Sequence, residues 1–154
     1  FHHYLYPFTY NPTRSYTYNP DINGQFVIRT LQGNDTNTEA DYAMMHFTLY
    51  AAEPFVDRGV HVYGAFNNFK IEEENKLFYN LEDKSYQGQI ILKQGFYNYT
   101  FATVDDYNTV DTNQINGTYF QTENEYTVIV YYKPFGGFYD RVIGIGVGFF
   151  NQNR

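Results

Sequence analysis

Histidine is the side chain of this sequence best suited to bind a metal ion or to transfer a proton, and the chain contains four: His2, His3, His46 and His61. Zinc sites in proteins hold their ligands at characteristic short spacings and often include cysteine. These histidines show no such spacing, because His46 and His61 fall in separate predicted strands and the other two stand at the start of the sequence. The chain has no cysteine, which excludes disulfides and thiolate ligands. The sequence therefore predicts no metal site.

The remaining groups capable of chemistry are an acidic run at 72–74 and the serines Ser15 and Ser85. Neither serine lies in the Gly-x-Ser-x-Gly turn that exposes a nucleophile. Three consecutive glutamates favour a solvated loop that keeps a strand edge from pairing, with a calcium site as the second interpretation. We therefore expect a protein that is not an enzyme, with no catalytic residue and no cofactor.

The composition is acidic and rich in aromatic side chains. Of 154 residues, 18 are Tyr and 15 are Phe, none is Trp, and the formal net charge is −7. Affinity for nucleic acid comes mainly from Lys and Arg that neutralise phosphates, so this charge argues against a nucleic-acid partner. No apolar run approaches the roughly 20 residues of a membrane-spanning helix, so we expect no direct insertion into a membrane. Tyr and Phe favour strands, and the composition predicts a β protein.

Alternating apolar residues and turn signals predict where the strands lie. The clearest segment, residues 42–52, alternates between an apolar face and a mixed face, as expected of a strand that covers a core on one side. A tight hairpin is expected at Gln94-Gly95, because glycine accepts the positive φ that such turns need. Residues 1–24 show neither the periodicity of a helix nor that of a strand, and they are interpreted as an extended lead-in rich in Tyr and Pro. Residues 25–151 are expected to form a single antiparallel, immunoglobulin-like β-sandwich of seven to eight strands.

Two features near the end of the sequence are candidates for protein contacts. The predicted turn at 134–138 places Phe135 and Phe138 at a hairpin tip, where they either contact a partner or fold back over the end of the sandwich. The last predicted strand carries three glycines on one face: Gly144, Gly146 and Gly148. Glycine weakens a strand, so this pattern indicates the close approach of other groups. Those groups are either ring-rich neighbouring strands of the same domain or a docked domain or partner.

One predicted strand ends in the unusual sequence VYGAFNNF, residues 62–69. Alternation predicts that Val62 and Phe66 point into the core. Asparagine often bonds nearby backbone groups in turns, so we expect the side-chain amides of Asn67 and Asn68 to hold this corner.

The corner, followed by the pattern Gly-x-Tyr-x-Tyr-x-Phe at 95–101, resembles the early-set immunoglobulin-like modules known as glycogen- or starch-binding domains. In that family a Trp of the corner forms part of a platform that stacks on sugars, and Phe69 stands at this position. The resemblance implies an early-set β-sandwich and, as an alternative function, a glucan-binding module. Such a module would need one exposed flat patch formed by Phe69, Tyr86 and Lys93.

A second resemblance covers nearly the whole chain and concerns the C-terminal half of the plug protein of the type IX secretion system. The blocks that carry it occur in the same order and lie at 18–29, 40–42 with 46–47, 62–68, 92–101, 122–133 and 139–144. Members of that family, found in Bacteroidetes, are periplasmic subunits that close the inner mouth of a large outer-membrane translocon barrel when no substrate occupies it. The resemblance implies the same role and location here. It also implies two partners, the outer-membrane translocon barrel and an upstream β domain of the same chain that is absent from this sequence.

Overall fold

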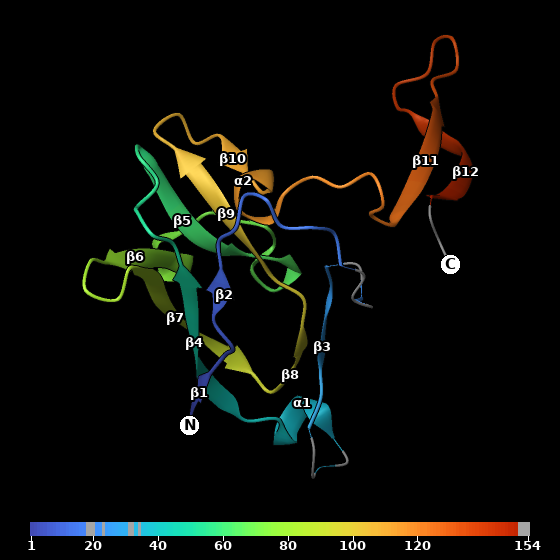
Figure 1. Cartoon of the computed structure of the whole chain (residues 1–154). Helices are drawn as coiled ribbons and strands as arrows, with labels where there is room; N and C mark the ends of the chain where they lie inside the picture. Colours follow the sequence, from blue (N-terminus) through green and yellow to red (C-terminus); the bar gives the residue numbers. More distant parts are fainter. Residues whose placement is uncertain (18–20, 23, 31–32, 34, 151–154) are drawn as a thin grey trace. The chain divides into compact units, whose positions relative to one another are not determined.

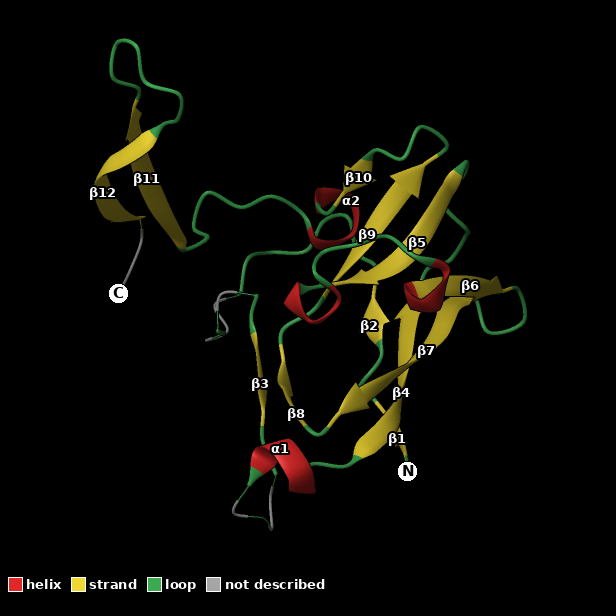
Figure 2. Ribbon diagram, turned by 180° about the vertical axis from the view of Figure 1, so that it is seen from behind, coloured by secondary structure: helices red, strands yellow, loops and turns green. Residues whose placement is uncertain are grey.

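The computed structural model describes residues 1–17, 21–22, 24–30, 33 and 35–150 (Figure 1). Strands dominate the secondary structure, and the helical segments are single turns (Figure 2). The strands are β1 (His2–Tyr4), β2 (Phe8–Thr9), β3 (Phe26–Ile28), β4 (Tyr42–Tyr50), β5 (Arg58–Tyr63), β6 (Lys76–Asn80), β7 (Ser85–Lys93), β8 (Gly95–Tyr97), β9 (Thr100–Asp105), β10 (Val110–Asp111), β11 (Asn124–Tyr132) and β12 (Arg141–Phe150). The turns are α1 (Thr36–Glu39), α2 (Asn113–Asn116) and the 3-10 segments η1 (Ala65–Asn67) and η2 (Glu73–Asn75). The predicted all-β class is confirmed.

The chain divides into two compact units, residues 1–118 and residues 119–154. The sequence had predicted one domain over 25–151 preceded by a separate lead-in. The first unit instead includes the lead-in, and the second unit contains the hairpin of β11 and β12. Each unit is therefore described by itself.

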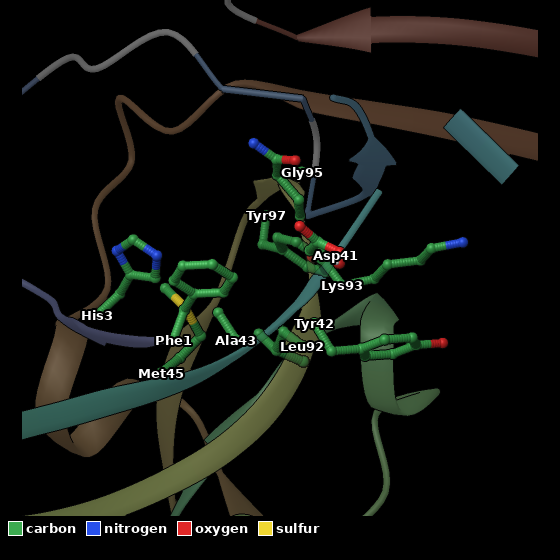
Figure 3. Close-up of a pocket in the computed structure, with 11 residues that line it drawn as sticks. Phe1, His3, Asp41, Tyr42, Ala43, Met45, Leu92, Lys93, Gly95 and Tyr97 are labelled. Atoms are coloured by element: carbon green, nitrogen blue, oxygen red, sulfur yellow. Dashed lines mark hydrogen bonds between the residues drawn. The ribbon is translucent and has the colours of Figure 1, made fainter. Parts of the chain in front are cut away.

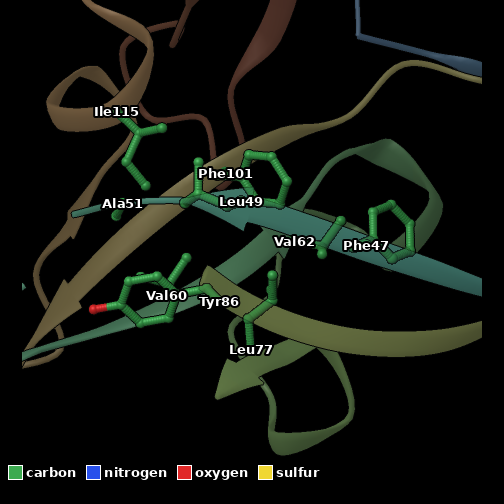
Figure 4. Packing of buried hydrophobic residues seen from close by; sticks show 9 residues of the cluster. All are labelled: Phe47, Leu49, Ala51, Val60, Val62, Leu77, Tyr86, Phe101 and Ile115. Atoms are coloured by element: carbon green, nitrogen blue, oxygen red, sulfur yellow. The ribbon is translucent and has the colours of Figure 1, made fainter. Parts of the chain in front are cut away.

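In the first unit, one sheet runs in the order β1, β4, β7, β6, β5, β9, β10, with β2 also paired to β4. Strand β6 pairs with β5 at its beginning and with β7 at its end. It thus joins a β4–β7 part to a β5–β9 part, and buried side chains from both parts form one core (Figure 4). This cluster consists of Phe47, Leu49, Ala51, Val60, Val62, Leu77, Tyr86, Phe101 and Ile115. The alternation predicted for residues 42–52 is confirmed, because Phe47 and Leu49 are 2% and 0% exposed.

The lead-in departs from the sequence prediction. Strands β1 and β2 both pair with β4, and both do so in parallel, so the sheet is mixed where a purely antiparallel one was expected. Two physical effects favour this arrangement. The short strands supply hydrogen bonds to the edge of β4, which would otherwise be unpaired. In addition, Phe8 of β2 and the flanking Leu5 and Tyr10 pack against the core cluster.

The tight hairpin predicted at Gln94-Gly95 is wrong. Strands β7 and β8 do flank this point, but β7 pairs with β4 and β6, whereas β8 pairs with β3. Gly95 is not among the residues with positive φ. Its missing side chain serves a different purpose, because a Cβ at this position would collide with the backbone carbonyl of Val27 in β3. The glycine thus allows two backbones to approach closely.

The corner after β5 agrees with the prediction in most respects. Val62 is 1% exposed, and Phe66 is half-buried against the core cluster. The Asn67 amide bridges the corner, since its Oδ1 accepts a hydrogen bond from the Gly64 N–H at 3.2 Å and its Nδ2 donates to the Val62 carbonyl at 3.1 Å. Asn68 contributes differently from the prediction: its backbone takes the left-handed conformation, with φ of 54°, and its amide makes no hydrogen bond to the described residues. Asparagine accepts this conformation more readily than most residues.

Candidate protein-contact site

The hairpin of β11 and β12 contains every contact residue predicted from the sequence (Figure 1). Its register pairs Asn124 with Phe150 at the open end and Tyr132 with Arg141 near the turn. A register shift after Val130 leaves Ile143 as an extra residue in β12. The remaining pairs define which side chains share a face, because residues directly opposite one another in an antiparallel pair point to the same side.

The turn between these strands displays two phenylalanines. The Gly137 N–H donates to the Pro134 carbonyl at 2.8 Å, and Gly136 has φ of 76°. Positive φ at the third position is typical of a tight turn that demands glycine there. Phe135 and Phe138 are exposed at 108% and 92%, so neither ring folds back over the strands of the hairpin. The exposure predicted for a contact site is therefore present, and the contact itself stays a prediction.

One face of the hairpin carries the three glycines. Gly144, Gly146 and Gly148 lie opposite Val130, Val128 and Tyr126. A Cβ added at the last two glycines would meet nothing within 4 Å, and one at Gly144 would only touch the Val130 side chain at 3.9 Å. Within the hairpin itself, no side chain therefore fills the space over the glycine face, and the close approach of other groups stays a prediction.

The opposite face of the hairpin is also apolar. Ile129, Ile145, Val147 and Phe149 share it with Thr127 and, near the open end, Glu125. Between 44% and 69% of each of these four apolar side chains is exposed. The sequence analysis had considered the close approach of other groups only for the glycine face.

The three residues of the alternative glucan platform do not form one patch. Tyr86 is 4% exposed in the core, where its hydroxyl accepts a hydrogen bond from the Phe55 N–H at 2.7 Å, and burial raises the pKa of this phenol. Lys93 lies at the opposite end of β7, roughly 23 Å from Tyr86 at about 3.3 Å per residue. Phe69 is 47% exposed and lies against Tyr63, with ring centroids 5.3 Å apart. The patch that a glucan-binding module would need is therefore not formed by these three residues, because Tyr86 belongs to the inward face of its strand.

Three of the four histidines fall into two separate local arrangements. His61 is buried in β5, with its Nδ1 3.0 Å from Asn75 Oδ1. In β4, the Nε2 atom of His46 lies 2.9 Å from the Nδ1 atom of His2, and the ring of His46 stacks on the ring of Tyr4. Within the part of the chain that the structure describes, no three His, Asp or Glu side chains are grouped so that they could hold a metal ion. The acidic run at 72–74 includes Glu73, which pairs with Lys76 at 2.9 Å.

A cavity that the sequence did not indicate lies in the first unit, where β1, β4, β7 and β8 meet (Figure 3). It has a volume of about 410 Å³ and is lined mainly by apolar side chains of β4 and β7 together with three aromatic rings. The residues that line it are Phe1, His3, Asp41, Tyr42, Ala43, Met45, Leu92, Lys93, Gln94, Gly95 and Tyr97. Because the cavity depends on the pairing of the lead-in with β4, it could not be predicted without that pairing.

Among the described residues there is no helix of the length and apolarity needed to cross a membrane.

Comparison with known proteins identifies a solved structure with the same fold. No family model and no curated protein matches the chain. A crystal structure of a hypothetical protein from Parabacteroides merdae is similar over 95% of this chain, with 39% sequence identity and a TM-score of 0.84. The match covers 37% of that protein's chain, so the present chain spans just over a third of the length of this relative.

Proposed function

We propose that this chain is part of a non-enzymatic periplasmic subunit that plugs the translocon barrel of the type IX secretion system. The sequence blocks that resemble the plug family support the proposal. So does the source of the similar structure, because Parabacteroides is a genus of the Bacteroidetes, in which that family is found. The observation that carries the proposal is the exposed pair of rings, Phe135 and Phe138, at a tight turn.

A plug must bind its barrel and later release it without unfolding. Two phenyl rings each contribute roughly 150–250 Å² of apolar surface when they are buried. Most of the resulting gain in free energy is offset by the cost of association, which leaves a contact that can be reversed. The rings stand on a turn, whereas the buried core lies in the first unit. Contact and release at the turn therefore require no change in the core.

The proposal is tested by deleting the full-length gene in a Bacteroidetes host and measuring the permeability of the outer membrane to a large dye. We expect a leak that wild-type protein restores and that Phe135→Asp with Phe138→Asp does not. The matched control is Tyr6→Asp with Tyr107→Asp, which also replaces two exposed rings, 97% and 90% exposed, in the first unit. This control should restore a tight membrane.

Co-purification separates the possible failures. If the membrane stays tight after deletion and the purified protein does not bind the translocon barrel, the plug function is wrong. If deletion causes a leak and both double variants restore the barrier equally, the plug function stands and the turn is not the contact.

A further inference from the structure

The apolar face of strands β4 and β7 is covered at one end and open at the other. Phe47 and Leu49 of β4 are buried in the core cluster. Met45 and Ala43 point to the same side, because side chains alternate along a strand, yet both are only half-buried. The cavity of about 410 Å³ begins at these two residues and at Leu92, which lies opposite Ala43 in β7. The cavity is therefore a continuation of the hydrophobic core that the described residues leave unfilled.

Aromatic rings form the walls of this cavity. On the β8 side, the hydroxyl of Tyr97 donates to the Lys93 carbonyl at 2.6 Å, and the Tyr97 ring stacks on Phe26 with ring centroids 5.5 Å apart. These two contacts fix the Tyr97 ring. On the β1 side, the Phe1 ring lies next to Met45 and is 85% exposed, so a molecule in the cavity buries it (Figure 3). Cavities of roughly 300–1,000 Å³ with apolar and aromatic walls and few polar groups are typical of small-molecule sites.

Three polar side chains that line the cavity have no partner of their own. The carboxylate of Asp41, the amide of Gln94 and the ring of His3 make no hydrogen bond or ion pair with the described residues. Gln94 is half-buried. A polar group that is partly removed from water gains stability when it forms a hydrogen bond. A ligand that bonds to this amide and to the neighbouring carboxylate is therefore favoured over one that is wholly apolar.

The charges around the cavity favour a cation over an anion. Asp41 supplies a carboxylate, and the formal net charge of the chain is −7. The Lys93 side chain, in contrast, extends away from Phe1 and Met45, and its Nζ lies 6.0 Å from the ring centroid of Tyr42 (Figure 3). Tyr42 lies on the opposite face of β4 from Met45, because side chains alternate along the strand. A protonated amine in the cavity is attracted by the carboxylate and by the faces of the aromatic rings.

We propose that this cavity binds a small organic cation in which a protonated amine is joined to an aromatic or branched apolar group. The apolar group lies on Met45 and Leu92, against the Tyr97 ring. The ammonium donates hydrogen bonds to the Asp41 carboxylate and to the amide oxygen of Gln94. The inference concerns residues of the first unit alone and is independent of the plug function, which rests on the turn of the hairpin.

Three indole probes of nearly equal size test the selection by charge: tryptamine is cationic, tryptophol is neutral and indole-3-propionate is anionic. The chain contains no Trp, so indole fluorescence reports on the probe alone when the excitation wavelength lies beyond the absorption of tyrosine. When chain 1–154 is titrated into tryptamine, we expect saturable binding with a dissociation constant below about 1 mM. Tryptophol should bind at least about fivefold more weakly and indole-3-propionate at least about 20-fold more weakly, because only the ammonium pairs with Asp41.

Variants locate the site and the charged contact. Asp41→Asn should weaken tryptamine binding about tenfold and change tryptophol binding by less than about twofold. Asp106→Asn is the matched control and should change neither, because it replaces an exposed carboxylate of the first unit that does not line the cavity. Ala43→Leu extends a side chain into the cavity and should weaken binding of all three probes at least about tenfold. Far-UV circular dichroism checks that this variant folds, and amide chemical-shift changes at Ala43 and Leu92 of the wild-type protein locate the probe without any substitution.

Several results would overturn the proposal. One is the absence of saturable tryptamine binding, and another is equal binding of the three probes, which would indicate burial of the indole ring without selection by charge. Tighter binding of indole-3-propionate would mean that Lys93 selects an anion. Unchanged tryptamine binding in Asp41→Asn, or chemical-shift changes confined to residues outside the cavity, would also contradict it.

Discussion

Replacing Asn67 by alanine tests how the corner after β5 is held. The substitution removes the bond that the Gly64 N–H donates at 3.2 Å and the bond that the amide donates to the Val62 carbonyl at 3.1 Å. Each hydrogen bond contributes about 1 kcal/mol net, and a buried donor left without an acceptor costs more. Gly64 is buried, and the side chain of Asn67 is the acceptor for its N–H. We therefore expect Asn67→Ala to lower the free energy of unfolding by about 2–3 kcal/mol.

The neighbouring asparagine provides a matched control. Asn68 has φ of 54°, and its amide makes no hydrogen bond to described residues. Glycine adopts this conformation at little cost, so Asn68→Gly should change the free energy of unfolding by less than about 0.5 kcal/mol. Both variants remove an asparagine side chain, one position apart, and glycine is used at Asn68 because of its positive φ.

Urea denaturation followed by far-UV circular dichroism measures the difference. With a slope of about 1.5 kcal/mol per M of urea, Asn67→Ala should move the midpoint down by more than about 1 M at unchanged slope. The reasoning is refuted if Asn67→Ala unfolds within about 0.3 M of wild type, or if Asn68→Gly is destabilised as much.

Three further predictions concern the first unit. Leu49→Ala should lower the free energy of unfolding by about 3 kcal/mol, because the Leu49 side chain is 0% exposed. Leu81→Ala is the control and should have little effect, because the Leu81 side chain is 78% exposed. The urea midpoints of the two variants measure the difference. Tyr86→Phe leaves a backbone N–H without its acceptor and should cost about 1–2 kcal/mol in the same assay. Hydrogen bonds from the Thr109 backbone N–H and its neighbours hold the pKa of Asp105 below its ordinary value of 3.8. Asp105 therefore adds stability above that pH, which is lost as the pH falls through the lowered folded-state pKa. Urea midpoints between pH 3 and 7 should fall less steeply on acidification in Asp105→Asn than in wild type, and identical profiles would contradict the assignment.

The secondary-structure class and the alternating pattern of β4 follow from the sequence alone. Tyr and Phe disfavour helix relative to strand, and the alternation at 42–52 is long enough to determine which side chains face the core. The tight turn that carries Phe135 and Phe138 was likewise predictable, because Pro, Gly and Gly at fixed positions define it by local backbone preference, whereas the sequence left open whether the two rings are exposed.

The pairing partners of the strands were decided only by the tertiary structure. Strands β1 and β2 comprise three and two residues, which is too short for alternation to be visible, and they form because the edge of β4 is available. The role of Gly95 was misassigned for a similar reason, since a glycine that accommodates a neighbouring backbone and a glycine at positive φ look the same in sequence. The role of Tyr86 at the alternative glucan platform could not be predicted for the same reason. A tyrosine in a strand suits both a sugar platform and a core, and which face of β7 packs against β5 and β9 depends on contacts between residues far apart in the chain.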